Sequence, residues 1–203
     1  EKSELERRAL DARMRLLQAQ VQPHFLFNTL ANVRALVNAG SPHASPVLDS
    51  LIAYLRAAVP RLDEPSATLR QELQLVRAYL ELMQMRMPDR LQFELRADEA
   101  ALDLVCRAMT LMTLVENAVR HGIEPKVEGG RIVVTGRVAG RSLELAVADN
   151  GVGLSNAAGN GLGLSNVRER LAALYGPEAR LAVVAGEGGG VSVKLTIPAP
   201  EGA

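Results

Sequence analysis

The stretch that most constrains how this chain can fold is Leu114–Gly122, Leu-Val-Glu-Asn-Ala-Val-Arg-His-Gly, which ends an apolar helical pattern over residues 102–121. A helix of that character buries its apolar side, and the polar residues at its end then lie at the margin of the core. A polar helix end that simply meets solvent is the alternative. We expect four of these polar residues to take part in a binding site: Glu116, Asn117, Arg120 and His121.

The rest of the C-terminal part alternates between strand, loop and helix patterns. Strands are predicted at residues 91–95, 132–138, 143–148, 181–184 and 191–197, and further helices at 69–83 and 164–175. Long helices packed on one face of a mixed sheet form an α+β sandwich. We therefore expect residues 67–203 to form one domain with this fold.

Asp149 ends one of the predicted strands and opens the sequence Asp-Asn-Gly-Val-Gly. A carboxylate fixed at a strand end can accept a hydrogen bond from an exocyclic amine, such as that of adenine. The glycines Gly151 and Gly153 would let a base approach the backbone closely. The same residues also form ordinary turns, so a simple Asp-Asn-Gly turn is the alternative.

The range Gly159–Gly163 has glycine at every second position and lies just before a predicted helix. Backbone amides at such a helix start suit phosphate oxygens. A Rossmann unit also has a glycine-rich loop, but there the loop directly follows the first strand, whereas here more loop precedes it. The amide of Asn117 and the carboxylate of Glu116 suit Mg²⁺ held beside phosphate, so these features together predict a nucleotide site.

The first 38 residues read as one long helix, with apolar or small residues at alternating steps of three and four. Pro23 predicts a kink because it removes a backbone hydrogen bond and its ring crowds the preceding turn. His24 follows it, one step off the apolar seam and therefore expected to face solvent, with Asn28 one turn further on. A second amphipathic helix over residues 47–55 and a linker at 60–66 complete a hairpin.

Two antiparallel helices cannot bury their apolar stripes without a partner surface. We therefore expect residues 1–60 to pair with a second copy of the chain as a dimeric four-helix bundle. The domain boundary is expected within the linker, between this hairpin and the sandwich.

Charge and cysteine content exclude several classes of protein. Lys plus Arg and Asp plus Glu both number 23, so the net charge is zero and no direct contact with nucleic acid is expected. The single Cys106 allows no internal disulfide, which fits a reducing compartment. No apolar run is long enough to cross a bilayer. Because the chain opens on Glu1 within a helical pattern, we expect it to be a fragment that lacks an N-terminal part.

The order of these motifs carries a family resemblance that extends from about Leu16 to Pro198. Glu-Asn-Ala-x-x-His-Gly at 116–122, Asp-Asn-Gly-x-Gly at 149–153 and Gly-Asn-Gly-Leu-Gly-Leu at 159–164 resemble the asparagine box and two glycine boxes of Bergerat-fold (GHKL) ATP-binding domains. Upstream, Gln-Pro-His-Phe-Leu-Phe-Asn at 22–28 resembles the phosphoacceptor box of LytS/YehU-type sensor histidine kinases.

This resemblance implies a protein-histidine kinase of a bacterial two-component system. His24 would take the γ-phosphoryl group of ATP and pass it to an aspartate of a response regulator. Asn117 would bind Mg²⁺, Asp149 would bind the adenine amine and Glu116 would activate the attacking group. The other residues implied in ATP binding are Arg120, His121, Gly151, Gly153, Gly159, Gly161, Leu162 and Gly163.

The resemblance also implies a setting for the chain. It would be the cytoplasmic domain of an inner-membrane homodimer, attached through a missing N-terminal sensor segment, and its response regulator would be of the DNA-binding LytTR type.

Phe25, Arg107 and Thr113 depart from the family pattern, and Asn28 matches a position known from other families. Phe25 stands where many histidine kinases have an acid that serves as base, so that role would fall to Glu116 or another group. Asn28 matches a position that helps dephosphorylate the regulator in other families, which implies a phosphatase or proton-transfer role. Arg107 and Thr113 replace usual prolines.

Two other functions remain open at this point. One is a Bergerat-fold ATPase that couples hydrolysis to conformational change, and the other is a signalling scaffold that binds nucleotide poorly.

Overall fold

The computed structural model describes residues 23–62, 64–153, 169, 172–173, 175–176 and 179–198. The chain divides into two compact units on either side of the bond between Asp63 and Glu64. The roles expected for the two parts, dimerisation and phosphotransfer for residues 1–60 and ATP binding for 67–203, remain predictions. Within the described residues, no helix has both the length and the apolar character needed to cross a bilayer.

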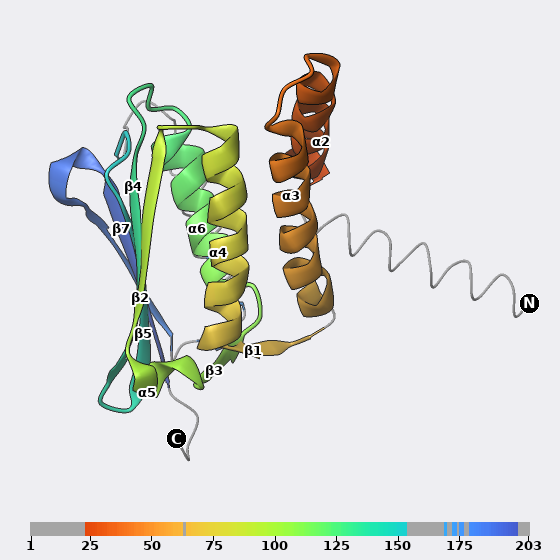
Figure 1. Cartoon of the computed structure of the whole chain (residues 1–203). Coiled ribbons are helices and arrows are strands. Elements are labelled where there is room, and N and C mark those ends of the chain that lie inside the picture. The colour runs from red at the N-terminus through yellow and green to blue at the C-terminus, as the bar shows by residue number, and fades with distance from the viewer. Residues whose placement is uncertain are drawn as a thin grey trace, which may run out of the picture. The chain divides into compact units, whose positions relative to one another are not determined.

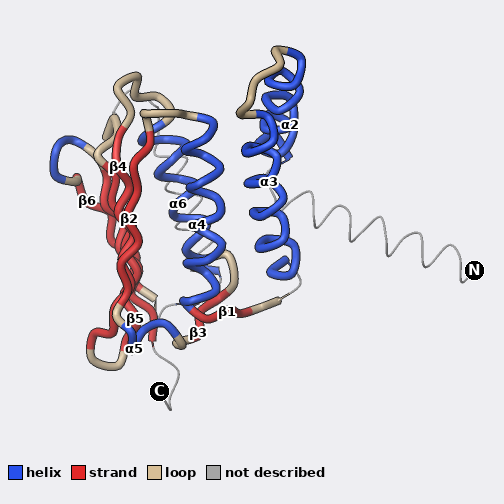
Figure 2. Tube along the Cα trace, in the orientation of Figure 1, coloured by secondary structure: helices blue, strands red, loops and turns tan. Residues whose placement is uncertain are grey.

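The first unit contains a pair of helices, α2 (Pro23–Asn38) and α3 (Ala44–Ala58), which lie side by side (Figures 1 and 2). Gly40, with φ +62°, lies in the turn between them, where Ser41 N–H donates to the Leu36 carbonyl at 2.9 Å. A left-handed glycine with this bonding is a common helix end. The predicted hairpin is therefore confirmed, whereas the predicted helix over residues 1–22 and its kink lie outside the described residues.

Helix α2 packs one side against α3 of the same chain. Among its described side chains Phe25, Thr29 and Val33 are buried, and the Phe25 ring meets Tyr54 of α3 edge to face at a centroid distance of 5.6 Å. The Thr29 hydroxyl is satisfied within the helix, because it donates to the Phe25 carbonyl at 2.8 Å. A different apolar set stays exposed in this unit: Phe27, Leu30, Val37, Leu48, Ile52 and Val59.

The second unit is built on a five-stranded mixed sheet with the order β2-β4-β5-β7-β6. Its strands are β2 (Leu91–Ala97), β4 (Gly130–Ala139), β5 (Ser142–Asp149), β6 (Arg180–Ala185) and β7 (Val191–Pro198). The β2–β4 pair is parallel and the other pairs are antiparallel. Each strand predicted from the sequence is present within a few residues of its expected bounds.

Two helices cover one face of this sheet, α4 (Leu69–Arg86) and α6 (Thr110–Asn117) (Figures 1 and 2). Burial alternates along β5, with Leu143, Leu145 and Val147 almost inaccessible to solvent. This is the pattern of a sheet with one packed face. The α+β sandwich expected from the sequence is therefore confirmed.

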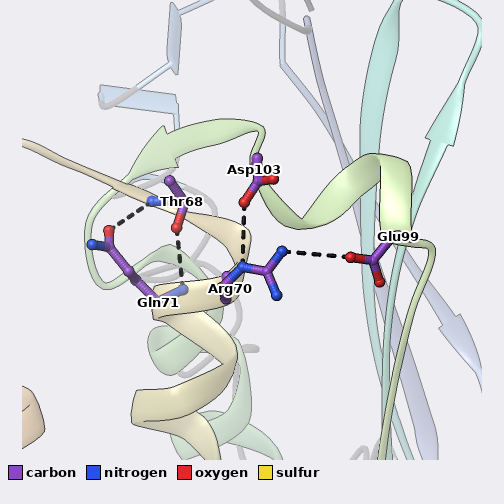
Figure 3. A network of polar contacts seen from close by, with 5 residues as sticks. All are labelled: Thr68, Arg70, Gln71, Glu99 and Asp103. Atoms are coloured by element: carbon purple, nitrogen blue, oxygen red, sulfur yellow. Dashed lines mark hydrogen bonds and ion pairs between the residues drawn. The ribbon is translucent and has the colours of Figure 1, made fainter.

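The start of α4 is fixed by a capping box and by ion pairs (Figure 3). Gln71 N–H donates to the Thr68 hydroxyl at 3.3 Å, and the Gln71 side chain accepts from Thr68 N–H at 3.0 Å. Arg70 reaches Asp103 at 3.2 Å and Glu99 at 3.6 Å, and all three side chains are solvent-exposed. The capping box satisfies two amides of the first turn, whereas exposed ion pairs of this kind contribute little.

The single helix predicted over residues 102–121 is wrong in its first part. Short helix α5 (Glu99–Leu102) is followed by strand β3 (Val105–Arg107), which pairs antiparallel with β1 (Ser66–Thr68). Helix α6 begins only at Thr110, after Met109 in a left-handed conformation with φ 64°. No left-handed residue can continue a right-handed helix, so the apolar run is divided here.

A buried carboxylate holds this unusual start of α6. Glu72 of α4 is 1 % exposed, and its two oxygens accept from Met109 N–H and Leu111 N–H, each at 2.8 Å. The first amides of a helix have no partner within it, and negative charge at that end is favourable. Glu72 therefore supplies the hydrogen-bond acceptors that a preceding helical turn, predicted from the sequence pattern, would have provided.

We expect Glu72→Ala to lower the free energy of unfolding by about 3 kcal/mol or more, because two buried amides lose a charged acceptor. Urea denaturation of the whole chain measures this. Glu81→Ala, on the exposed side of the same helix, is the matched control and should change stability by less than about 0.5 kcal/mol. Equal stability of the two variants would refute this account of the α6 start.

Candidate functional site

Glu116 and Asn117 are the last two residues of α6, and both are half-buried. Beyond them the helix continues as a π-helical segment, η2 (Ala118–Ile123), in which Glu124 N–H donates to the Val119 carbonyl at 2.9 Å. Such widened turns are rare and frequent at functional sites. In η2 the hydrogen-bonded residues are five apart, so Asn117 and His121 do not have the relative orientation that two residues four apart have in a regular α-helix.

Arg120 and His121 lie in η2 with exposed side chains. Partial burial of the ring, and then the charge of Arg120, lower the pKa of His121 below its usual value. The imidazole is therefore neutral at pH 7 and can accept as well as donate a hydrogen bond. Arg120 remains the permanent cation at this end of the helix.

Asp149 is the last residue of β5 and is 7 % exposed. Its Oδ1 accepts from Gly151 N–H at 2.9 Å and from Val191 N–H at 3.3 Å. Burial raises the pKa of this carboxyl, while those two amides and Lys126 act in the opposite direction. Both bonds end on Oδ1, so among the described residues Oδ2 is left as an acceptor for a ligand.

The backbone of η2 packs directly against this carboxylate. A Cβ atom built on Gly122 would lie 2.6 Å from Asp149 Oδ1, and one built on Gly151 would clash with the Gly122 carbonyl. The Gly122 carbonyl also accepts from Val152 N–H at 3.0 Å. The two motifs at 116–122 and 149–153 therefore meet in a cradle that a single added methyl group would fill.

The loop after Asp149 is held from both sides. Asn150 Oδ1 accepts from Arg131 N–H at 2.6 Å, and its carbonyl accepts from Lys126 Nζ at 2.6 Å. The turn between β6 and β7, which contains three consecutive glycines at 188–190, lies against the same loop, because a Cβ on Gly153 would clash with the Gly189 carbonyl.

Sequence reasoning overlooked several contributors to the cradle. Gly122 and Lys126 were not singled out, although a glycine directly after the polar helix end was visible. The π-helical segment has no sequence signal that distinguishes it from a continued α-helix. The contact of Gly190 with the Asp149 backbone depends on strand pairing far along the chain.

Other predicted site residues are not placed beside this cradle. Gly159, Gly161, Leu162 and Gly163 lie outside the described residues. The backbone of His24 is in α2, but its side chain and its predicted exposure are likewise not described. Asn28 follows one turn later on the same helix and is exposed.

The donor set at the cradle fits an adenine nucleotide. A buried carboxylate with one oxygen available suits an exocyclic amine. The described residues contain no group of three or more His, Cys, Asp or Glu able to hold a metal ion. Mg²⁺ is nevertheless compatible, because it is commonly bound through one or two protein oxygens together with substrate phosphates.

Two family models match consecutive parts of the chain. Residues 12–91 match the histidine kinase model, and residues 107–201 match the model of histidine kinase-, DNA gyrase B- and HSP90-like ATPases. The sensor protein LytS of Oceanobacillus iheyensis is 34 % identical over 143 residues, which are 70 % of this chain and 24 % of LytS. The sensor histidine kinase BtsS of Escherichia coli K12 is 35 % identical over 137 residues, 68 % of this chain and 24 % of BtsS.

Solved structures of the histidine kinase ThkA share the fold. Its catalytic domain has a TM-score of 0.52 at 21 % identity and covers 66 % of this chain and 94 % of that chain. A crystal structure of ThkA in complex with the response regulator TrrA has a TM-score of 0.51 at 18 % identity and covers 98 % of this chain and 66 % of that chain.

Hairpin, sandwich and sequence similarity together place the chain among the histidine kinases with a GHKL-type ATPase domain. Within them it belongs to the LytS/YehU-type sensor histidine kinases. The chain spans about a quarter of the length of the curated relatives it matches.

Proposed function

We propose that this chain binds Mg²⁺·ATP at the cradle and transfers the γ-phosphoryl group to His24, from which it passes to an aspartate of a response regulator. The observation that carries the proposal is the buried Asp149 carboxylate, set against Gly122 and Gly151 in a member of the histidine kinase family. Three segments distant in sequence converge there, and a structural turn alone does not require an acid with a raised pKa.

Recognition of the base follows from the atoms at the cradle. Asp149 Oδ2 accepts a hydrogen bond from the exocyclic amine of the base, while Oδ1 keeps its hydrogen bonds from the backbone amides of Gly151 and Val191. These amides fix the carboxylate plane before any ligand arrives, so little ordering is needed on binding. Because Gly122 and Gly151 carry no side chain, their backbones and the Asp149 carboxylate can pack closely together, which fixes the position of this acceptor.

The phosphate end is assigned to the polar end of α6 and to η2. Asn117 offers an amide oxygen to Mg²⁺, and Arg120 offers a guanidinium to phosphate oxygens. His121, Gly153 and the glycine-rich range Gly159–Gly163 complete this side of the proposed site. The bound Mg²⁺·ATP supplies the transferable phosphoryl group, and catalysis of such a transfer is mostly positioning and charge neutralisation.

The transfer itself forms a P–N bond at the His24 imidazole and breaks the P–O bond to ADP. The attacking nitrogen must carry its lone pair, which a typical imidazole pKa of about 6.5 allows at neutral pH. Glu116 is the candidate base that takes the ring proton, since Phe25 follows His24 where other families place an acid. Asn28 is the candidate for the phosphatase or proton-transfer role.

The partner and the setting rest on the relatives. ThkA has been crystallised with a response regulator, and we extend that class of partner to this chain, in the form of a LytTR-type DNA-binding regulator. We also propose that the chain is the cytoplasmic part of an inner-membrane sensor, joined to it through an N-terminal segment.

A test of the function is the fate of the γ-phosphate. The chain is incubated with γ-labelled ATP and Mg²⁺, and protein-bound label and free phosphate are counted over time. A histidine kinase accumulates at most one label per acceptor and releases little phosphate. Many phosphates released per chain without protein label would indicate an ATPase, and neither signal, without nucleotide binding, would indicate a scaffold.

The exposed apolar residues of the hairpin support the proposed homodimer. One exposed apolar row runs along α3 to its C-cap, with steps of four and seven between Leu48, Ile52 and Val59. On α2 the exposed Leu30 and Val37 are seven residues apart. A stripe with this spacing suits a helix bundle.

We expect Ile52→Lys to convert the dimer to a monomer, because an ammonium group would be buried without a partner. Sedimentation equilibrium measures the mass. Ala53→Lys, an exposed neighbour on the same helix, is the control and should leave the dimer intact. A dimer that survives Ile52→Lys unchanged would move the interface to another surface.

A further inference from the structure

The far end of the helix that forms the proposed site is held by an arginine from another part of the chain. Arg90 lies in the turn between α4 and β2, and its Nη2 donates to the Glu124 carbonyl at 3.1 Å and to the Lys126 carbonyl at 2.8 Å. These carbonyls follow η2 directly. The last carbonyls of a helix have no partner within it, and positive charge is favourable at that end. Arg90 supplies both the donor and the charge.

The backbone of Arg90 is bonded to the same segment. Its carbonyl accepts from Gly130 N–H at 2.8 Å, and a Cβ atom on Gly129, where φ is +74°, would clash with that carbonyl. The Lys126 carbonyl accepts a further bond from Gly129 N–H at 2.9 Å. The side chain and the main chain of Arg90 therefore fix the connection between η2 and β4 at both of its ends.

Glu72 and Arg90 hold the two ends of one continuous helical stretch, residues 110–123. The Glu72 carboxylate accepts from amides at the start of α6, and the Arg90 guanidinium donates to the carbonyls after η2. Glu72 lies within α4 and Arg90 follows its end, and α4 and α6 lie side by side on the sheet (Figure 1). Each charge has the sign that its helix end favours. The stretch that carries Glu116 and Asn117 is thus held at both ends by α4 and the turn after it.

The hold at the end of η2 affects the cradle because η2 is a π-helical turn. Glu124 N–H donates to the Val119 carbonyl, five residues back, at 2.9 Å. Four-residue bonding is the ordinary state of a helix and π-helical turns are rare, so the widened form depends on contacts outside the turn. A return to four-residue bonding would turn Gly122 about the helix axis. Gly122 packs so closely on Asp149 that a Cβ atom there would lie 2.6 Å from Oδ1, so such a rotation changes the cradle.

The same segment also contacts the other side of the cradle. Lys126, whose carbonyl accepts from Arg90, donates from its Nζ to the Asn150 carbonyl at 2.6 Å. Asn150 directly follows Asp149 along the chain. Arg90 is therefore connected to both motifs of the cradle, to one through the end of η2 and to the other through Lys126.

We propose that Arg90 is a positioning residue for nucleotide binding, because its guanidinium fixes η2 in the form that sets Gly122 against Asp149. The inference rests on the proposed function and adds a residue outside the motifs that define it. Without this hold η2 adopts the ordinary helical spacing more often, and only the π-helical form presents the cradle. Apparent affinity falls by the fraction of chains in the other form. Bound nucleotide selects the π-helical form, so the phosphoryl transfer then proceeds as before.

Arg90→Met tests this, since it removes the donors and the charge and keeps an unbranched side chain. In the whole chain we expect the Kd for Mg²⁺·ADP and the apparent KM for ATP to rise about tenfold. The rate of labelling at saturating ATP should stay within about twofold of wild type. Arg90→Lys keeps a charged donor and should recover most of the affinity, with a Kd within about threefold of wild type.

Arg77→Met is the matched control, since it makes the same change on the exposed side of α4. It should leave Kd and KM unchanged. A purely structural role for Arg90 would lower the melting temperature of the variant and leave the Kd of the folded protein at its wild-type value, which would overturn the inference. Should Arg90→Met not fold, Arg90→Gln, shorter and uncharged, decides in its place by the same comparison of Kd. A wild type that binds no nucleotide contradicts the proposed function instead.

Discussion

Asp149→Asn is expected to weaken ATP binding by at least about 100-fold while the fold is retained. The Asn side chain keeps Oδ1 as an acceptor for the amides of Gly151 and Val191, so the local bonding of the wild type is preserved. At the other position an NH₂ group replaces Oδ2. Both this group and the exocyclic amine of the base are hydrogen-bond donors, so they cannot pair. Loss of a bond to a charged group, plus an unpaired buried donor, costs about 3 kcal/mol or more.

The free energy of unfolding of Asp149→Asn should rise or stay unchanged, although ATP affinity falls. Burial raises the pKa of Asp149, so the folded state holds the proton more tightly than the unfolded chain does. The stabilisation that this proton provides is therefore present at low pH and is lost as the pH rises through the folded pKa, which leaves a cost at neutral pH. The neutral amide removes that cost. An ATP titration and a urea unfolding curve at pH 7 measure the two effects.

The control is Asp98→Asn, which changes an exposed carboxylate of the same domain and should alter neither quantity. Unchanged ATP affinity in Asp149→Asn would show that the cradle does not read the base. A joint loss of affinity and folding would show that the carboxylate is structural.

His24→Gln is expected to abolish protein labelling by γ-labelled ATP, with ATP affinity unchanged. The amide of Gln lacks a nucleophilic nitrogen, whereas Gln is a better helix former than the His it replaces, so the helix should persist. Quantitative label counting on equal amounts of folded protein measures the loss. Circular dichroism of the variant checks the helix.

The chain has three histidines, and one of the others provides a control. His43 precedes α3, is exposed and forms no side-chain cap bond, so His43→Gln should be labelled like wild type. His121 is unsuitable because it belongs to the proposed site. Label that persists in His24→Gln would place the acceptor on another residue.

Sequence patterns predicted most of the sandwich, and the agreement is clearest in β5, where burial alternates along the whole strand. Along β5 every second side chain is buried, and Ser142 and Glu144 lie on the other face, so period and burial agree except that the buried set ends with the polar Asp149.

The motifs at 116–122 and 149–153 were predicted to share one nucleotide site. The acid and glycines at 149–153 suit a base, and Glu116 and Asn117 suit Mg²⁺ beside phosphate. Their direct contact through Gly122 depends on the tertiary fold and has no signal in the sequence.

The errors share a physical origin, which is that tertiary contacts overrode a local pattern. Residues 102–109 are apolar enough for a helix, yet Glu72, distant in sequence, supplies a better cap at Met109 and the preceding residues pair with β1. In α2 the side that packs on α3 is set by Phe25 against Tyr54, whereas Leu30 and Val37 of the predicted seam stay exposed, and whether they face a second copy remains a prediction.

The most direct measurement of the central claim is the position of the phosphate in the wild-type chain after incubation with Mg²⁺·ATP. Proteolysis and mass spectrometry under neutral or alkaline conditions, which preserve phosphohistidine, locate the modified residue. The account predicts phosphate on the imidazole of His24, lost on brief acid treatment. Acid-stable phosphate on a hydroxyl side chain, or an unmodified His24 beside freely released phosphate, would contradict it.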